Sequence, residues 1–180
     1  MHLIDKELIE KFKKKDKEAF SEIVEEYSDR LYNLIYKMVL NRDDSMDILQ
    51  NTFLKTYKSA DKFKGESSIY TYLAAIALNE ARERFRKEKR FLFFDLDIID
   101  EEKQIPDISD EKEKENAGER INFALAKLPE SFREVLVMKD IDGLSLKEIS
   151  DITGLSEGGV KARLHRARML LKRMFNEGKE

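Results

Sequence analysis

Hydrophobic residues recur every three or four positions along most of the 180-residue chain, which is the period of an amphipathic α-helix. The longest such stretch runs from Lys17 to about Leu40. Further helices are predicted at about 4–12, 42–58, 69–90, 117–128 and 129–141. No alternating strand pattern with a hairpin turn interrupts them. The pattern predicts an all-α protein.

Polar residues at the ends of these stretches predict where the helices begin. Asp16 is a typical N-cap, residues 41–44 break one helix and cap the next, and Ser67 or Ser68 caps the helix that follows a loop at 59–68. In the helix at 42–58, Met46, Leu49, Phe53 and Tyr57 are expected inside, with Asp47, Gln50, Asn51 and Lys55 outside.

The segment Leu144–Arg173 predicts a helix-turn-helix. Ser145 and Glu148 have the spacing of a capping box, Gly154 fits a sharp turn, and Ser156 can cap a second helix. That second helix carries six Lys or Arg against one acid within 156–173, a density that suits phosphate groups of DNA. Its candidate DNA contacts at the first turns are Ser156, Gly158, Gly159, Lys161, Arg163, His165 and Arg166.

Charge divides the chain into three parts, although the net charge is only −3. Residues 1–90 carry 19 basic and 17 acidic side chains, 91–115 carry 3 and 10, and 116–180 carry 12 and 10. The middle part contains Pro106 and has no helical period. We therefore expect two small helical domains, at 1–90 and 116–180, joined by an acidic flexible linker at 91–115.

The sequence lacks the residues and motifs that several classes of chemistry require. The chain has no Cys and only two His, His2 and His165, and it contains no phosphate-binding GxxxxGK loop, HExxH motif or metal-ligand cluster. We expect no catalytic residues, no metal and no cofactor. Since no apolar run approaches the roughly 18 residues of a membrane span, no membrane insertion is expected and the predicted location is cytoplasmic.

Two long stretches are similar to the extracytoplasmic-function (ECF) sigma factors of bacteria. The first is FSEIVEEYSDRLYNLIYKMVLNRDDSMDILQNTFLKTYKSADKFKGES with the following YTYLAAIALNEARERFRKEKR, and the second is LPESFREVLVMKDIDGLSLKEISDITGLSEGGVKARLHRARMLL. The resemblance covers nearly the whole chain. It implies a sigma factor that directs core RNA polymerase to promoters and assists their opening.

The resemblance also implies partners and site residues. Partners would be promoter DNA, core RNA polymerase through the clamp helices of β′ and the flap of β, and an anti-sigma factor. Polymerase-binding residues would be Asp47, Leu49, Gln50 and Phe53, and −10 DNA residues would be Phe63, Lys64, Gly65, Glu66, Ser67, Asn79 and Arg82. The −35 element would be read by the residues of the second helix named above.

Alternatives remain open at this stage. Phe63 could be a plain hydrophobic plug instead of a base contact. A stand-alone helix-turn-helix regulator is the second interpretation, and a helical scaffold protein is the third. The sequence departs from the family pattern at Ala75 and Leu78, where basic residues are frequent, and at Gly159 and Ala162, where Thr and Ser are common.

Overall fold

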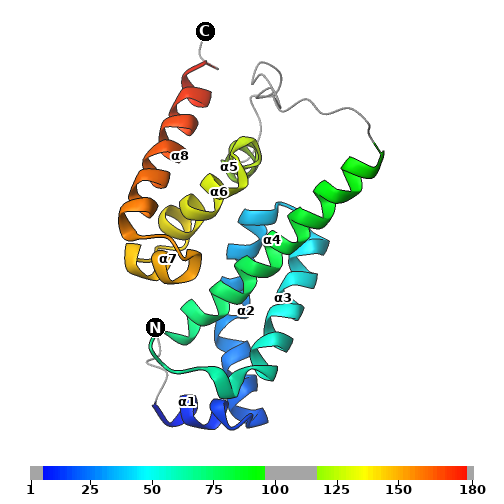
Figure 1. The fold of residues 1–180 in the computed structure, drawn as a ribbon, viewed down its shortest axis with the longest axis vertical. Coiled ribbons are helices and arrows are strands. Elements are labelled where there is room, and N and C mark those ends of the chain that lie inside the picture. The colour runs from blue at the N-terminus through cyan, green and yellow to red at the C-terminus, as the bar shows by residue number, and fades with distance from the viewer. Residues whose placement is uncertain (1–5, 96–116, 178–180) are drawn as a thin grey trace.

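A computed structural model describes residues 6–95 and 117–177, and every regular element in these two ranges is helical (Figure 1). The elements are α1 (Lys6–Lys13), α2 (Lys17–Val39), α3 (Arg42–Lys58), η1 (Ala60–Lys62), α4 (Ile69–Asp95), α5 (Ala117–Lys127), α6 (Glu130–Leu136), η2 (Val137–Ile141), α7 (Leu146–Thr153) and α8 (Glu157–Glu177). The predicted all-α class is confirmed.

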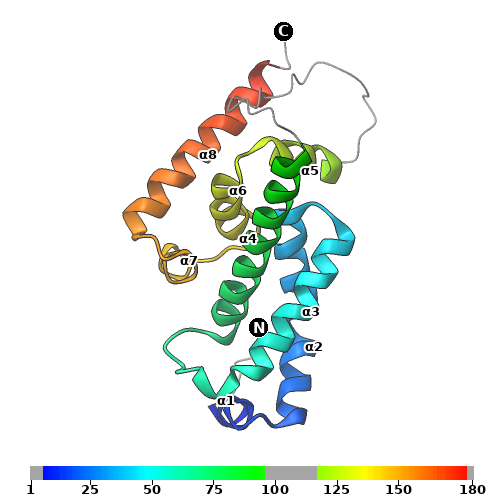
Figure 2. The same ribbon diagram turned by 45° about the vertical axis from the view of Figure 1, so that its right-hand side comes forward.

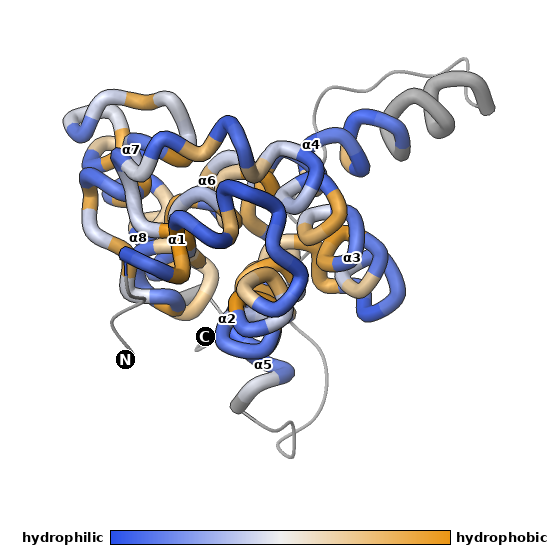
Figure 3. Tube along the Cα trace, turned by 90° about the horizontal axis from the view of Figure 1, so that it is seen from below, coloured by the Kyte–Doolittle hydropathy of each residue, from blue (hydrophilic) through white to orange (hydrophobic). Residues whose placement is uncertain are grey.

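The N-terminal domain consists of α1 to α4, with α2, α3 and α4 packed against one another and α1 across their lower end (Figure 2). The predicted caps set these helices: the Asp16 carboxylate accepts from Ala19 N at 2.9 Å, and Asn41 accepts from Asp44 N at 3.0 Å. Hydrophilic and hydrophobic stretches alternate along the helices (Figure 3), as amphipathic packing requires.

The inner face of α3 differs from the prediction. Met46 is 46 % exposed, whereas the buried stripe includes Ser45, Thr52 and Thr56. The Ser45 and Thr52 hydroxyls donate to the carbonyls of Asn41 and Ile48, four residues earlier, so they satisfy their hydrogen bonds without water. Small hydroxyl residues therefore occupy the crowded contact with α2 and α4, and the prediction that Met46 lies inside was wrong.

Helix α4 extends to Asp95, five residues beyond the predicted end of its domain. The stretch after Arg90 contains neither Pro nor Gly before that point, so nothing in it stops a helix that is already under way. The predicted start of the linker at 91 therefore falls within α4. The remainder of the predicted linker, 96–115, lies outside the described residues.

The C-terminal domain, α5 to α8, contains the predicted helix-turn-helix. The capping box is complete: the Ser145 hydroxyl accepts from Glu148 N at 3.1 Å, while the Glu148 carboxylate accepts from Ser145 N at 2.8 Å. Gly154 ends α7 with a φ of 74°, and the Ser156 hydroxyl accepts from Gly159 N at 3.1 Å at the start of α8. The predicted caps and turn are confirmed.

The two domains lie in direct contact. Helix α7 packs on α4, and α2 contacts η2, α5 and α6 (Figures 1 and 2). Arg133 of α6 is buried and donates from Nη1 to the carbonyl of Met38, near the C-terminal end of α2, at 2.8 Å. Its Nη2 donates to the carbonyls of Ala126 and Leu128 at 3.1 Å. One guanidinium thus satisfies carbonyl groups in both domains.

Candidate nucleic-acid and polymerase interfaces

The first turns of α8 bring the predicted −35 residues onto one end of the helix-turn-helix. Val160, Leu164 and Ala167 face the core, with exposures of 0 %, 4 % and 0 %. The opposite side of the helix presents the predicted polar residues to solvent: Ser156, Gly158, Lys161, His165 and Arg166 are exposed, and Gly159 and Arg163 are half-buried. The helix therefore offers its cationic N-terminal half outward, as a helix entering a DNA groove does.

Gly159 has a packing role in addition to its predicted role toward DNA. A Cβ at this position would lie 3.3 Å from Ser156 Oγ and 3.7 Å from Leu155 Cβ, whereas a Cβ at Gly158 would only meet Ser156 Oγ at 3.9 Å. A side chain at 159 would therefore press on the hydroxyl that caps α8. Sequence reasoning did not find this role, because it depends on the position of the cap.

One exposed cation of α8 pairs with an acid of its own domain. Arg168 donates to Asp140 of η2 from Nη2 at 2.6 Å and from Nε at 3.0 Å. The hydrogen bond to Asp140 raises the pKa of Arg168. Part of the positive charge that the sequence assigned to phosphate binding is therefore engaged within the protein, and it supports the contact between α8 and η2.

The predicted −10 loop lies between η1 and α4. Lys64, Gly65 and Glu66 are exposed, and Gly65 adopts a φ of 78°, the left-handed conformation that glycine accepts without strain. Ser67 is half-buried. Ser68 caps α4, since its hydroxyl accepts from Thr71 N at 3.1 Å. The loop thus presents three consecutive exposed residues next to a fixed helix start.

Phe63 does not share this exposure. Its side chain is 3 % exposed, with ring centroids of Tyr72 at 5.0 Å and Phe12 at 6.1 Å. The prediction that its ring offers a surface for an unpaired base is corrected, because the N-terminal helix α1 and the first turn of α4 cover it. Phe63 is the hydrophobic plug of the alternative interpretation, and it anchors the loop.

The two predicted −10 residues on α4 differ in their surroundings. Asn79 is exposed. Arg82 donates to the Glu134 carboxylate of α6 from Nη2 at 2.8 Å and from Nε at 3.0 Å. This hydrogen bonding raises the pKa of Arg82. The structure therefore brings Asn79 and Arg82 onto neighbouring positions of one helix, with Arg82 occupied by the C-terminal domain.

The predicted polymerase-binding residues divide into surface and core. Asp47 and Gln50 are exposed on α3, but Leu49 and Phe53 are only 8 % and 9 % exposed. The prediction that Leu49 and Phe53 belong to the binding face is corrected: they pack inside and hold α3 in place.

Two apolar residues that the sequence analysis did not place on a binding face share the exposed side of α3. Met46 is 46 % and Leu54 is 57 % exposed, and by helical spacing both fall beside Asp47 and Gln50. The surface is therefore mixed, with two polar and two apolar side chains. We call Met46, Asp47, Gln50 and Leu54 the α3 face. The helical period of α3 could have shown this face, but Met46 is large and apolar and was therefore expected in the core.

No group of three His, Asp or Glu side chains in residues 6–95 and 117–177 is arranged to hold a metal ion. Among the helices of these same ranges, none combines the length and apolar character needed to cross a membrane.

Comparison with known proteins matches both halves of the chain. The family model described as Sigma-70 region 2 matches residues 23–91, and that described as Sigma-70, region 4 matches residues 118–171. The ECF RNA polymerase sigma factor SigW of Bacillus subtilis is 34 % identical over 188 residues, covering 98 % of this chain and 100 % of the relative. The ECF RNA polymerase sigma-E factor of Haemophilus influenzae is 32 % identical, covering 94 % of each chain.

Two solved structures share the fold. The structure of CnrH in complex with the cytosolic domain of CnrY matches with a TM-score of 0.70 and 24 % identity, covering 94 % of this chain and 95 % of that one. The sigma factor RpoE of Bartonella quintana, in complex with the anti-sigma factor NepR, matches with a TM-score of 0.72 and 22 % identity, covering 87 % and 96 %.

A helix-turn-helix with a cationic second helix, joined to a helical domain that matches Sigma-70 region 2, defines a transcription initiation factor of the sigma class. Within that class, the chain belongs to the ECF RNA polymerase sigma factors. It directs core RNA polymerase to specific promoters and assists their opening. The family consists of non-enzymatic initiation factors, and the comparisons do not support the stand-alone regulator.

Proposed function

We propose that the chain divides its task among three surfaces: the α3 face binds core polymerase, the loop at 64–67 with Asn79 and Arg82 binds the −10 element, and the N-terminal half of α8 reads the −35 element. Residues 1–90 then form one functional domain, 116–180 the other, and 91–115 the connection between them. The observation that carries the proposal is the separation of these surfaces onto different elements, each backed by its own buried residues.

At the −35 element, Lys161, Arg163 and Arg166 contact base edges or flanking phosphates. Support comes from the exposed or half-buried position of these side chains just beyond the N-terminus of α8. Ser156 holds that first turn, and Gly158 and Gly159 keep it narrow. His165 lies on the same surface, next to the DNA backbone.

At the −10 element, the loop captures an unpaired base of the opened strand. Capture requires hydrogen bonds to the base edge, at an unstacking cost of about a few kcal/mol. Lys64, Glu66 and Ser67 supply these groups, Gly65 permits the turn, and buried Phe63 anchors the loop without touching the base. Asn79 and Arg82 hold the adjoining DNA.

Transcription in vitro with core polymerase tests this assignment. Changing Gly65-Glu66-Ser67 to Ala-Ala-Ala should leave polymerase binding intact, abolish opening of duplex promoter DNA, and leave activity partly restored on a pre-melted bubble template. Opening is followed by the fluorescence of 2-aminopurine placed in the −10 element. A matched control changes Glu25-Glu26 on the exposed side of α2 to Ala-Ala and should open DNA normally. Normal duplex opening by the loop variant would contradict the proposal.

For polymerase binding, Asp47 and Gln50 provide polar contacts and Met46 and Leu54 an apolar contact. The double variant Asp47→Ala, Gln50→Ala should reduce co-purification with core polymerase. Leu54→Ala should also reduce it, although this substitution removes only apolar surface. Asp29→Ala removes an exposed acid from α2 and serves as the control. Equal recovery of all these variants would contradict the assignment of the α3 face.

We further propose that the protein acts in the cytoplasm, without catalysis of its own, and that an anti-sigma factor regulates it. The fold relatives support the last point, since the RpoE structure contains the anti-sigma factor NepR. A protein partner of this kind should compete with core polymerase for the chain in a pull-down assay. If no competitor is found in the cell of origin, control must lie in synthesis or proteolysis.

A further inference from the structure

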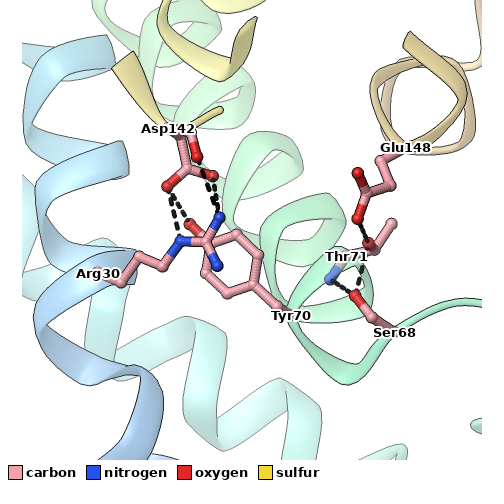
Figure 4. A network of polar contacts seen from close by, with 6 residues as sticks. All are labelled: Arg30, Ser68, Tyr70, Thr71, Asp142 and Glu148. Carbon is pink, nitrogen blue, oxygen red and sulfur yellow. Dashed lines mark hydrogen bonds and ion pairs between the residues drawn. The ribbon is translucent and has the colours of Figure 1, made fainter. Parts of the chain in front are cut away.

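The exposed loop at 64–67 is held at both of its ends. At the end nearer to α4, the Ser68 hydroxyl accepts from Thr71 N at 3.1 Å and lies 2.8 Å from Thr71 Oγ1 (Figure 4). At the other end, Phe63 N donates to the Ala60 carbonyl at 3.2 Å, and the Phe63 side chain is buried. The position of the loop therefore depends on what holds these two ends.

Aromatic rings from two helices hold the Phe63 end. The Phe12 ring of α1 lies 6.1 Å from the Phe63 ring, edge to face at 62°, and the Tyr72 ring of α4 lies 5.0 Å from it. Phe12 is 0 % exposed and is itself backed by Phe20 of α2, whose nearly parallel ring lies 6.5 Å away. Aromatic pairs at these separations attract each other. A smaller residue at position 12 would leave a cavity beside Phe63.

Hydrogen bonds join the same end of the loop to α3 and α4. The Ser59 hydroxyl, at the junction of α3 and η1, donates to the Lys55 carbonyl at 2.7 Å. Its proton is therefore used, so the Tyr72 hydroxyl, 2.7 Å from Ser59 Oγ, is the donor in that contact. The first turn of α4 thus holds the start of η1 as well as the Phe63 ring.

The turn between α1 and α2 directs α1 toward η1, which it contacts at the lower end of the domain (Figure 2). Lys15 in this turn has a φ of 61°, a left-handed conformation that persists only where other contacts hold it. Its carbonyl accepts from the Tyr57 hydroxyl at 3.0 Å, and its Nζ lies 3.0 Å from Asp61 Oδ1 of η1. Both side chains of this ion pair are exposed, so it contributes little. The packing of Phe12 on Phe63 is the stronger contact between α1 and the loop.

We propose that α1 takes part in promoter opening: Phe12 is a positioning residue that, through Phe63, holds the loop at 64–67 in the conformation that receives the unpaired −10 base. The proposal rests on the function proposed above for that loop. Helix α1 precedes residues 23–91, which the Sigma-70 region 2 model matches, so the match assigns this helix no role. A loop that is already ordered binds more tightly, because it loses less conformational freedom on binding.

Hydrogen exchange in the full chain, followed by mass spectrometry, measures how firmly the loop is held. The Lys62 amide donates to the Ser59 carbonyl at 2.9 Å. The Phe63 amide donates to the Ala60 carbonyl in the same way, so exchange of these two amides reports local opening of η1. Phe12→Ala should speed this exchange by about tenfold.

A matched control separates this effect from a general loss of stability. Leu34 of α2 is 2 % exposed, so Leu34→Ala also leaves a cavity in the core of the N-terminal domain. It lies about 21 Å from Phe20 along α2, at about 1.5 Å per residue. Exchange at Lys62 and Phe63 should therefore stay near that of the unchanged chain. Equal acceleration by Phe12→Ala and Leu34→Ala would overturn the proposal.

The functional readout uses the assembled polymerase. With Phe12→Ala, binding of core polymerase and of −35 duplex DNA should be normal, whereas a single-stranded −10 oligonucleotide should bind about tenfold more weakly and duplex opening should slow. Phe12→Leu keeps an apolar side chain against Phe63 and should restore most of the lost binding. A merely structural role would lower all of these activities together. Unchanged −10 binding by Phe12→Ala would overturn the proposal.

A milder variant decides the question where Phe12→Ala does not fold. Tyr72→Phe removes one hydroxyl and its hydrogen bond to Ser59 but keeps the ring against Phe63. It should speed exchange at the start of the loop and slow duplex opening by about threefold. Tyr32→Phe, which removes a hydroxyl from the C-terminal half of α2, is the control. Exchange and opening equal to those of the control would overturn the proposal.

Comparison with the Ala-Ala-Ala variant of residues 65–67 separates the two levels of the argument. If that variant loses opening while Phe12→Ala retains it, the role of α1 is overturned and the function of the loop stands. If that variant opens duplex DNA normally, the function of the loop is overturned, and the role of α1 is overturned with it. Loss of opening in both, with normal opening by Leu34→Ala, is the result expected.

Discussion

The buried guanidinium of Arg133 should make a large contribution to stability, because it satisfies three backbone carbonyl groups, and two of these hydrogen bonds are buried. Its three hydrogen bonds go to Met38 at the end of α2 and to Ala126 and Leu128 at the junction of α5 and α6. Hydrogen bonds that involve a charged group contribute about 1.5–3 kcal/mol each. Against this stands the cost of burying the guanidinium, which also lowers the pKa of Arg133 and leaves its Nε without a hydrogen-bond partner.

The informative substitution is Arg133→Met, which keeps most of the volume and removes the hydrogen bonds. The three hydrogen bonds together stabilise the folded state by about 5–9 kcal/mol, and desolvation of the guanidinium offsets several kcal/mol of this stabilisation. We therefore expect a net loss of about 2–4 kcal/mol in the free energy of unfolding. This is a large share of the roughly 5–15 kcal/mol typical of a folded protein.

Urea unfolding followed by circular dichroism at 222 nm measures this loss. The urea midpoint of Arg133→Met should fall clearly while that of Arg120→Met, which changes an exposed arginine of α5, should stay within error of the unchanged chain. Buried charges can sometimes be replaced by apolar residues without loss. An Arg133→Met protein as stable as the control would therefore show that the three hydrogen bonds contribute no net stability, and the reasoning would be refuted.

Three further predictions concern the helix-turn-helix. The Ser145 hydroxyl holds the pKa of Glu148 below its ordinary value of 4.5, so the stability from this carboxylate is fully present above pH 4.5 and is lost as the pH falls through the folded-state pKa. Glu148→Gln should therefore lower the free energy of unfolding at pH 7. In unfolding curves recorded at acid pH, the difference from the unchanged chain should become smaller. Gly154→Ala should cost about 1–2 kcal/mol in thermal unfolding, because φ is 74° there; an unchanged midpoint would contradict this. In fluorescence anisotropy titrations, Arg163→Ala should weaken binding to the preferred −35 sequence by about 1–3 kcal/mol more than binding to scrambled DNA. Lys172→Ala should weaken binding to both sequences alike and reduce its salt dependence. Equal loss on both sequences for Arg163→Ala would argue against base reading.

The helices, their caps and the family could be predicted from the sequence because they depend on neighbouring residues. Asp16, Asn41 and the pair Ser145 and Glu148 each act within three positions along the chain, and the structure shows each contact. The two domains of the ECF sigma factors were likewise recognisable, since their motifs are continuous stretches. Local hydrogen bonding and helical period leave few alternatives for such features.

Burial within a face required the tertiary structure. Periodicity places Met46, Leu49 and Phe53 near one side of α3, but only the packing of α2 and α4 decides that Leu49 and Phe53 are covered while Met46 is exposed. Phe63 is similar, because a loop phenylalanine can face solvent or the core. Its burial depends on Phe12, 51 positions earlier in the chain, and no local pattern records that contact.

The contact between the domains was beyond sequence reasoning altogether. Arg30 and Asp142 are separated by 112 positions, and Arg82 and Glu134 by 52. With 34 basic and 37 acidic residues in the chain, charge alone allows very many pairings of this kind. Only the packing of α7 on α4 and of η2 on α2 selects these two, because it brings both members of each pair within hydrogen-bonding distance.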